Sequence, residues 1–150
     1  MNPLVLDALL ASLHHLLVFS LVAVLFAELV LISGPADAGR LRQLGKLDGA
    51  YGMLSMGVIA AGFVRAIYGA KGWSYYAHNH MFWAKITLFI IVGLMSAVPT
   101  MRLIRWRKQG TLPDTAALQS TRQWMLAEVA VIALIPIVAI LMARGIGYGS

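Results

Sequence analysis

Hydrophobic positions in this chain come in long runs, and polar positions gather in the shorter segments between them. Apolar runs cover residues 4–32, 47–68 and 82–103, and a fourth predicted helix extends over residues 115–143. Each run approaches or exceeds the roughly 20 residues that a helix needs to cross about 30 Å of hydrocarbon. We therefore predict an all-α protein, a membrane-embedded antiparallel four-helix bundle, in which the whole chain forms a single four-transmembrane-helix domain.

The amino-acid composition agrees with a membrane protein and removes several kinds of site. Hydrophobic residues make up 60% of the chain and charged residues 12%, with a mean hydropathy of +0.79, outside the range of ordinary soluble domains. The chain contains no cysteine. This excludes disulfides, iron–sulfur clusters, thiolate zinc sites and covalently attached c-type haem.

Basic residues are concentrated at the ends of the predicted spans. Eight of the 12 lysines and arginines lie near the first and third connections, which four spans place on the same side. Because cytoplasmic segments carry the excess of positive charge, we expect a multi-pass protein of the bacterial inner membrane with both termini on the periplasmic side. A net charge of +6 at the membrane edges favours anionic lipid headgroups as partners and no nucleic acid. The eight residues are Arg40, Arg42, Lys46, Arg102, Arg105, Arg107, Lys108 and Arg122.

Ionisable residues interrupt the first apolar run. Asp7, His14 and Glu28 recur at multiples of seven residues and therefore share one side of the helix. His14 is expected to face the bundle interior about halfway through the bilayer, whereas His15 diverges from it by about 100° and serves as an auxiliary or interface residue. An ionisable group at that depth costs a few kcal/mol unless it is paired, so a ligand or proton-handling role for His14 is favoured over a neutral, hydrogen-bonded imidazole.

Charged residues of the other spans fall into two levels. The outer level gathers His14, Arg65 and Lys85, and Asp7 is the one acid in the sequence that could pair with these cations. Cations without counter-charges favour an anionic ligand. Tyr68, Lys71, His78 and His80 are expected above this group. At the inner level we predict an ion-pair network that clamps the helices, formed by Glu28, Asp48, Glu128, Arg102 and Arg122.

Small residues follow one side of the second span, at Gly52, Ser55, Gly62 and Ala66. Such a stripe permits close packing of helices, which is its commoner use, or leaves room for a flat ligand. The sequence pattern leaves both possibilities open.

Several motifs are specific enough to indicate a family. They are LLASLHHLLVF in the first span, LDGAYG and AAGFVRAIYGAKGWSYY in the second, and NHMFWAKITLF and SAVPTMRLIRWR in the third. With these motifs the chain closely resembles, over almost its whole length, an uncharacterised bacterial family of predicted membrane proteins, domain of unknown function 2214. The resemblance implies a membrane protein and brings no activity.

A more distant resemblance concerns the small membrane protoporphyrinogen oxidases of the HemJ type, which are four-helix haem-b proteins. It rests on a histidine in the first span, a glycine and an arginine late in the second, and an aromatic-x-lysine start of the third. It implies functional roles for His14, or His15, and for Lys85. The chain departs from that pattern in its double histidine, in Glu28 and in the segment GWSYYAHNH.

A haem b site has clear requirements: an axial imidazole, a cleft between helices and cations for two propionates. The first-span histidine would be the metal ligand, and the small-residue stripe would supply the cleft. A second axial imidazole would require His78 or His80 to fold inward. The expected site comprises His14, Lys85 and Arg65 as catalytic residues, His14 as the metal ligand, and His15, Lys71, His78, His80 and Tyr68 as further cofactor-binding residues.

Three functional hypotheses follow from the sequence. The first is a haem- or porphyrin-binding membrane oxidoreductase with its site in the outer half of the bundle. The second is a small proton- or ion-coupled transporter or channel, in which Asp7, His14, Glu28 and Glu128 would pass protons or cations. The third is a non-catalytic accessory or assembly subunit. Membrane lipid is the expected partner, the first hypothesis adds a porphyrin or other small-molecule substrate, and assembly into a homo-oligomer is left open.

Overall fold

The computed structural model describes residues 2–148, and these residues form helices with no strand. The helices are α1 (Pro3–Ile32), α2 (Ala38–Tyr68), α3 (Gly72–Ala77), α4 (His80–Gln109), α5 (Thr115–Ile132) and α6 (Leu134–Ala143). Four helical segments are long and apolar enough to cross a membrane: α1, α2, α4 and residues Thr115–Ala143, which comprise α5 and α6. The all-helical class and the four candidate spans are thereby confirmed.

Two helices extend beyond their apolar runs. α2 begins at Ala38 instead of residue 47, and α4 ends at Gln109 instead of residue 103. The added turns contain arginine and lysine, which are good helix formers although they are unsuited to lipid. The side chain of Asp37 caps the start of α2 by accepting from the Arg40 backbone N–H, and Gly110, with φ of 64°, ends α4. The hydropathy pattern therefore predicted the apolar part of each helix but not the residues at which the helix begins and ends.

The fourth span is interrupted near its middle. α5 ends at Ile132, and α6 starts after a single turn residue, Ala133. Pro136 explains the break, because proline has no N–H to bond the Ile132 carbonyl and its ring clashes with that carbonyl. α4, by contrast, continues through the buried Pro99.

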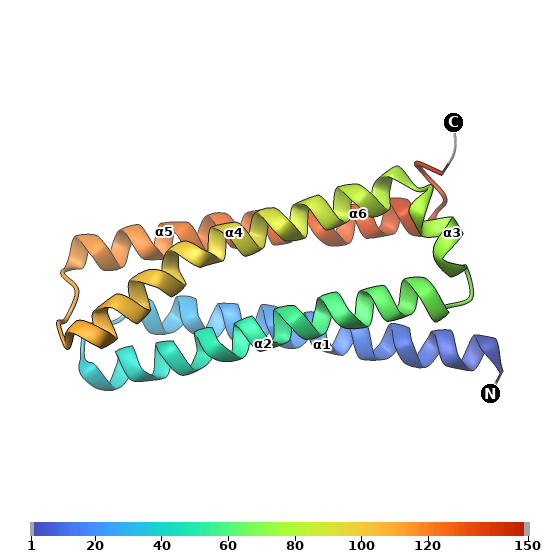
Figure 1. Ribbon diagram of the computed structural model, residues 1–150. Coiled ribbons are helices and arrows are strands. Elements are labelled where there is room, and N and C mark those ends of the chain that lie inside the picture. The colour runs from blue at the N-terminus through green and yellow to red at the C-terminus, as the bar shows by residue number, and fades with distance from the viewer. Residues whose placement is uncertain (1, 149–150) are drawn as a thin grey trace.

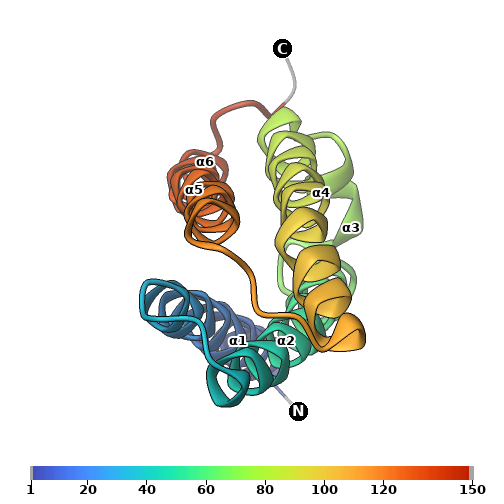
Figure 2. The ribbon, with the colours of Figure 1, turned by 90° about the vertical axis from the view of Figure 1, so that its left-hand side faces the viewer.

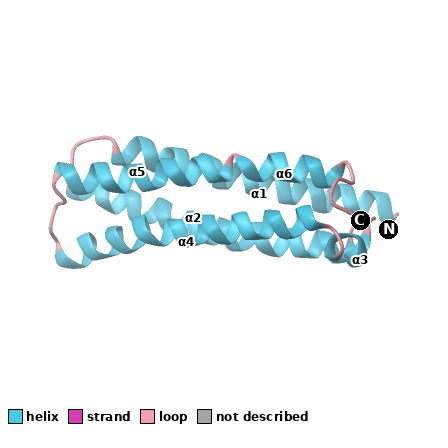
Figure 3. Cartoon of the chain, turned by 90° about the horizontal axis from the view of Figure 1, so that it is seen from above, coloured by secondary structure: helices cyan, strands magenta, loops and turns pink. Residues whose placement is uncertain are grey.

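Two helix pairs build the bundle. α1 packs along α2, and α4 packs along α5 and α6 (Figure 1). α1 also contacts α5 and α2 contacts α4, so the four long elements form a ring, seen end-on in Figure 2. Both chain termini lie with α3 at one end of the bundle, here called the terminal end (Figures 1 and 3). The connections at residues 33–37 and 110–114 lie at the other end, the basic end.

The fourth side of the ring is not uniform along its length. α6 contacts α4 and α5, but no Cα atom of α6 lies within 8 Å of a Cα atom of α1 or α2, and the structure describes these three helices from end to end. α1 and α5 do contact each other. The two helix pairs therefore approach each other through α1 and α5 in the basic half, while α6 in the terminal half lies farther from α1.

Buried apolar side chains form three clusters along the bundle axis. One lies at the basic end, one in the middle and one at the terminal end, while many other leucine, isoleucine and phenylalanine side chains are exposed on the outside, as expected for contact with lipid. The clusters are built on Leu29, Ile32, Leu41, Leu44, Leu103 and Met125; on Leu21, Leu25, Tyr51 and Val58; and on Ala66, Tyr76 and Phe82.

The end of the chain is fastened to α3 and to the start of α4. The Tyr75 hydroxyl donates a hydrogen bond to the Met142 carbonyl at 3.1 Å, and the His80 backbone N–H donates to the Gly147 carbonyl at 2.8 Å. The rings of Tyr75 and Tyr148 stack with centroids 4.9 Å apart. α6 is thereby held at the terminal end through its own Met142 carbonyl and through residues that follow it in the chain.

Replacing Tyr75 with phenylalanine is expected to weaken this attachment, because it removes the donor to the Met142 carbonyl and keeps the stacked ring. The expected loss is about 1 kcal/mol of unfolding free energy. Thermal unfolding of detergent-solubilised protein, followed by tryptophan fluorescence, would measure it. Tyr68→Phe is the matched control, since Tyr68 is 66% exposed; equal effects of the two substitutions would contradict the assigned contact.

Candidate functional site

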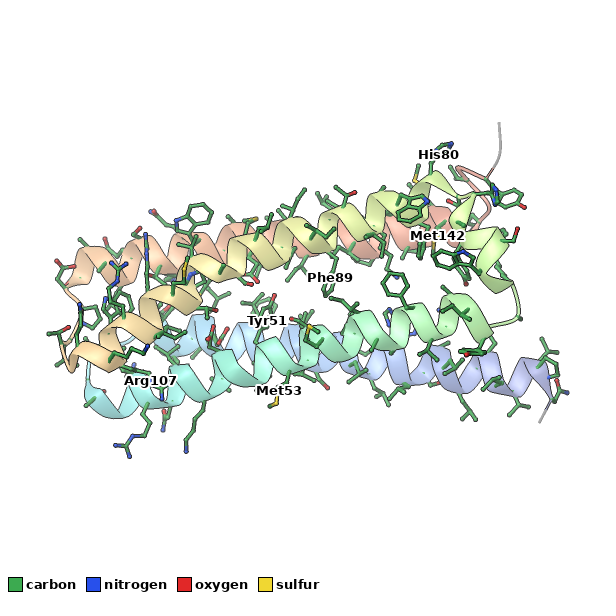
Figure 4. All side chains as sticks on the ribbon, viewed as in Figure 1. Tyr51, Met53, His80, Phe89, Arg107 and Met142 are labelled. Atoms are coloured by element: carbon green, nitrogen blue, oxygen red, sulfur yellow. The ribbon has the colours of Figure 1, made fainter. Side chains whose placement is uncertain are left out.

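A group of acidic residues and their hydrogen-bond donors lies inside the basic half of the bundle. We call Glu28, Asp48, Tyr51, Thr100 and Glu128 the acidic cluster. The Tyr51 hydroxyl donates to the Glu128 carboxylate, and the Thr100 hydroxyl donates to Asp48 Oδ1 at 2.6 Å. Figure 4 shows Tyr51 directed from α2 toward the opposite helix pair. These two hydrogen bonds join α2 to α5 and α2 to α4, while Glu28 is contributed by α1.

Burial of the two glutamates is almost complete. Glu28 is 2% exposed and Glu128 is 1% exposed. Oxygen Oε1 of Glu28 has no hydrogen-bond partner among the described residues. The charged neighbours of Glu28 are themselves acids, Asp48 and Glu128. A buried carboxylate in such surroundings is stable only when it holds a proton or a cation, because an uncompensated buried charge costs several kcal/mol.

The predicted ion-pair network at this level is not formed. Across residues 2–148 the ion pairs within 4.0 Å are Asp37–Arg40 and Asp7–Arg65. Arg102 instead donates to the hydroxyls of Ser120 and Thr121 at 3.0 Å, and Arg122 donates to the Ser33 hydroxyl at 3.0 Å. The prediction that Glu28, Asp48, Glu128, Arg102 and Arg122 pair with one another was wrong.

Direction around the helix explains this outcome. The glutamates have no arginine within ion-pair distance, because Arg102 is directed to the α5 hydroxyls, including that of the buried Thr121, and the exposed Arg122 is directed to Ser33. Arg107 is the one cation whose charge acts on Asp48, and it does so from beyond ion-pair distance. The carboxyl groups of the acidic cluster thus have no basic side chain paired with them among the described residues.

Coordination of a metal ion by this cluster is not supported. No group of three or more histidine or acidic side chains within the described part of the chain has the spacing to hold a metal. Glu128 and Asp48 each accept a hydrogen bond from a hydroxyl group instead, and these two bonds are separate from each other.

A second polar group surrounds His14 in the terminal half; we call His14, Arg65 and Lys85 the His14 site. His14 is 8% exposed, and its ring packs on Gly62, where an added Cβ would lie 3.3 Å from Cε1 of the imidazole. Lys85 and Arg65 are close enough to act electrostatically on that ring. Heptad spacing therefore predicted correctly that His14, and not the exposed His15, faces the interior.

The balance of charge at this site differs from the expectation. Asp7 lies 3.5 Å from Nε of Arg65, so one of the two cations has a counter-charge. Lys85, which is half-buried, has no carboxylate within 4.0 Å among the described residues. Nδ1 of His14 likewise has no hydrogen-bond partner there. One uncompensated positive charge remains beside a buried imidazole.

The other residues expected at a cofactor site lie elsewhere. Nδ1 of His15 is 2.6 Å from the Ala11 carbonyl oxygen, and Nδ1 of His78 is 2.8 Å from the Ser74 carbonyl oxygen, so both rings bond to their own helices. His80 is exposed and points away from the bundle in Figure 4. Tyr68 and Lys71 are also exposed. The imidazole beside His14 is that of His15, which lies edge-on to it with ring centroids 6.1 Å apart.

The small-residue stripe is divided between two uses. Gly62 is covered by the His14 ring, which is the close-packing use. Gly52 and Ser55 instead line a groove of about 460 Å³ between α2 and α4, which contains no histidine. The residues present thus do not fit a haem, since the imidazole and the open space are in different places. Haem b stays a prediction that this arrangement does not support.

A layer of hydrocarbon separates the two polar groups. It consists of Leu21, Leu25 and Val58, with Leu17 and Phe89 packed against them. Figure 4 shows Phe89 directed from α4 into the bundle. From His14 to Glu28 the rise along α1 is about 21 Å. An apolar layer of this kind excludes water and blocks the passage of ions.

Tyr51 and Thr100 were not identified from the sequence, because neither carries a charge. Tyr51 lies three residues after Asp48 and so on the same face of α2. That spacing could have identified Tyr51 as a neighbour of Asp48. It could not have predicted the contact with Glu128, which lies 77 residues away in the chain.

Comparison with known families bears on the whole chain. A family model described as "Predicted membrane protein (DUF2214)" matches residues 6–147. The chain belongs to this family. The DUF2214 match includes both polar groups and all four candidate spans. No curated protein and no solved structure matches the chain.

Proposed function

We propose that this DUF2214 protein is a proton-coupled membrane transporter in which Glu28 and Glu128 bind the transported proton. The observation that carries the proposal is the burial of two carboxyl groups inside the bundle without a basic partner. Ionisable groups in the interior of membrane bundles mark proton relays and ion pathways because their burial is otherwise costly. The hydrogen bonds that Glu128 and Asp48 accept come from hydroxyl groups, which supports a proton as the bound species.

The orientation in the membrane follows from the charge distribution. Lysines and arginines are concentrated at the basic end, so we place that end in the cytoplasm and both termini on the periplasmic side of a bacterial inner membrane. The acidic cluster then lies on the cytoplasmic side of the apolar layer and the His14 site on the periplasmic side. The hydrocarbon between them belongs to a closed state of an alternating-access cycle.

Reconstitution into liposomes tests this function directly. Liposomes of neutral lipid that enclose a pH-sensitive dye would be given a pH gradient together with a mixture of small organic solutes. Proteoliposomes are expected to dissipate the gradient faster than protein-free liposomes in a solute-dependent manner. Identical rates with and without protein, over a broad set of solutes, would contradict proton coupling.

The visible spectrum of the purified protein separates this proposal from the haem hypothesis. Protein from haem-sufficient cells is expected to show no Soret band. A Soret band that His14→Ala abolishes would instead support a haem-binding oxidoreductase.

A further inference from the structure

The His14 site carries one positive charge more than it carries negative charge. Asp7 is the acid that approaches it, and this carboxylate is committed to Arg65 at 3.5 Å. Lys85 has no ion-pair partner across residues 2–148, although it lies half-buried within a membrane span. Lys85 lies about 8 Å along α4 from its start at His80. A half-buried ammonium group there is stabilised by an accompanying anion, and the charge balance favours a monoanion.

Two nitrogen atoms at the site lack a hydrogen-bond partner. They are Nδ1 of His14 and Nε of Arg65, both buried, and the residue His14 is itself 8% exposed. The Arg65–Asp7 contact at 3.5 Å brings the charges together without satisfying the Nε–H. The Nε–H of Arg65 is always a donor, and Nδ1 of His14 is a donor when the imidazole carries a proton there. An unpaired buried donor costs about 1–3 kcal/mol. In that protonation state an acceptor with two oxygen atoms would satisfy both nitrogens.

The surroundings of the His14 site are apolar. Leu17 and Val58 lie toward the middle of the bundle. α6, in the same half of the bundle, has the sequence LIPIVAILMA and no charged side chain. An anion held beside the cations would therefore have hydrocarbon side chains around its other end, which suits an anion with an apolar tail.

We propose that the His14 site binds an oxyanion of single negative charge, with Lys85 as its counter-ion and His14 and Arg65 as hydrogen-bond donors. This inference rests on the proposed function only where it makes the anion the substrate: a monoanion that moves with one proton crosses the membrane without net charge. Two sources share the chemistry, namely a free carboxylate with a short apolar tail and the phosphodiester headgroup of an anionic lipid.

Thermal stabilisation by added ligand tests the site without requiring transport. A ligand that binds the folded state raises the melting temperature in proportion to its affinity. The full chain would be placed in neutral detergent and titrated with sodium hexanoate in one arm and with phosphatidylglycerol in the other, against sodium chloride at equal ionic strength. We expect at least one arm to raise the melting temperature beyond the chloride control, and the arm that does so identifies the source.

Lys85→Met is expected to weaken that binding by about tenfold or more, because the charged partner is lost and the hydrocarbon stem is kept. Lys71→Met is the matched control: Lys71 is exposed, so its variant is expected to bind as the unaltered protein does. Without ligand, Lys85→Met is expected to unfold no earlier than the unaltered protein, since an unpaired charge has been removed. Loss of response in that variant is thus distinguished from misfolding.

Two results would overturn the inference: no stabilisation in either arm, or equal stabilisation of the unaltered protein and the Lys85→Met variant. Proton flux with no anion binding would leave the proposed function standing and reject this site. Anion binding in a protein that dissipates no pH gradient would reject the proposed function and leave the site standing.

Discussion

Proton flux is expected to fall by at least tenfold when Glu128 is replaced with glutamine. Glutamine has nearly the same shape and its amide oxygen can still accept from the Tyr51 hydroxyl, but it cannot take up a proton. Because the residue is 1% exposed, the substitution also removes an acid from a place where its charge is costly. Unfolding stability is therefore expected to stay the same or to rise. Flux would be measured with an enclosed pH-sensitive dye and stability by thermal unfolding.

Asp37→Asn serves as the control for removal of an acid. Asp37 is an exposed capping residue outside the bundle interior, and asparagine caps helices about as well as aspartate, so this variant is expected to keep both flux and stability. Glu28→Gln is expected to behave like Glu128→Gln. Full proton flux in both glutamine variants would show that the acidic cluster does not carry the proton.

The second large effect is expected from Leu25→Ala, in the middle of the apolar layer. Leu25 is 2% exposed, and truncating a buried leucine typically costs about 2–5 kcal/mol through lost contacts and the remaining cavity. The cavity also thins the layer that keeps water out between the His14 site and the acidic cluster. We therefore expect both a lower melting temperature and a proton leak that no longer depends on solute.

Leu94→Ala is the matched control for that substitution. It removes the same atoms from a transmembrane helix, but Leu94 is 70% exposed and faces the surroundings of the bundle. Little change in stability and no leak are expected. If the two leucines gave the same leak, the apolar layer would not be the barrier.

The spans and the inward side of the first helix could be predicted from the sequence. Hydrocarbon thickness sets the length of the apolar runs, and heptad spacing places His14 and Glu28 on one side, where both are buried. These are properties of a single helix and its solvent. They need no knowledge of the neighbouring helices.

Contacts between helices were harder to predict. The residue number indicates how far along the bundle axis Glu28 and Arg122 lie, but not which neighbouring helix each side chain faces. Ion-pair partners were therefore predicted from depth in the membrane alone. Arg122 bonds to Ser33, and Glu128 accepts from Tyr51. Hydroxyl groups carry no charge, so the pattern of charged residues along the sequence does not identify them. The hydroxyl partners of the acids and arginines were therefore found only in the structure.

The interruption at Ala133 divides the fourth span into two segments with different attachments. α5 carries Glu128 against Tyr51, while α6 packs on α4 and α5 and is hydrogen-bonded to α3 through its Met142 carbonyl. A helix that lacks one backbone hydrogen bond, as Pro136 requires, bends at lower energy than an intact helix. The bend consequently lets the two segments take different directions, so that Glu128 can keep its contact with Tyr51 while the far end of α6 stays bonded to α3.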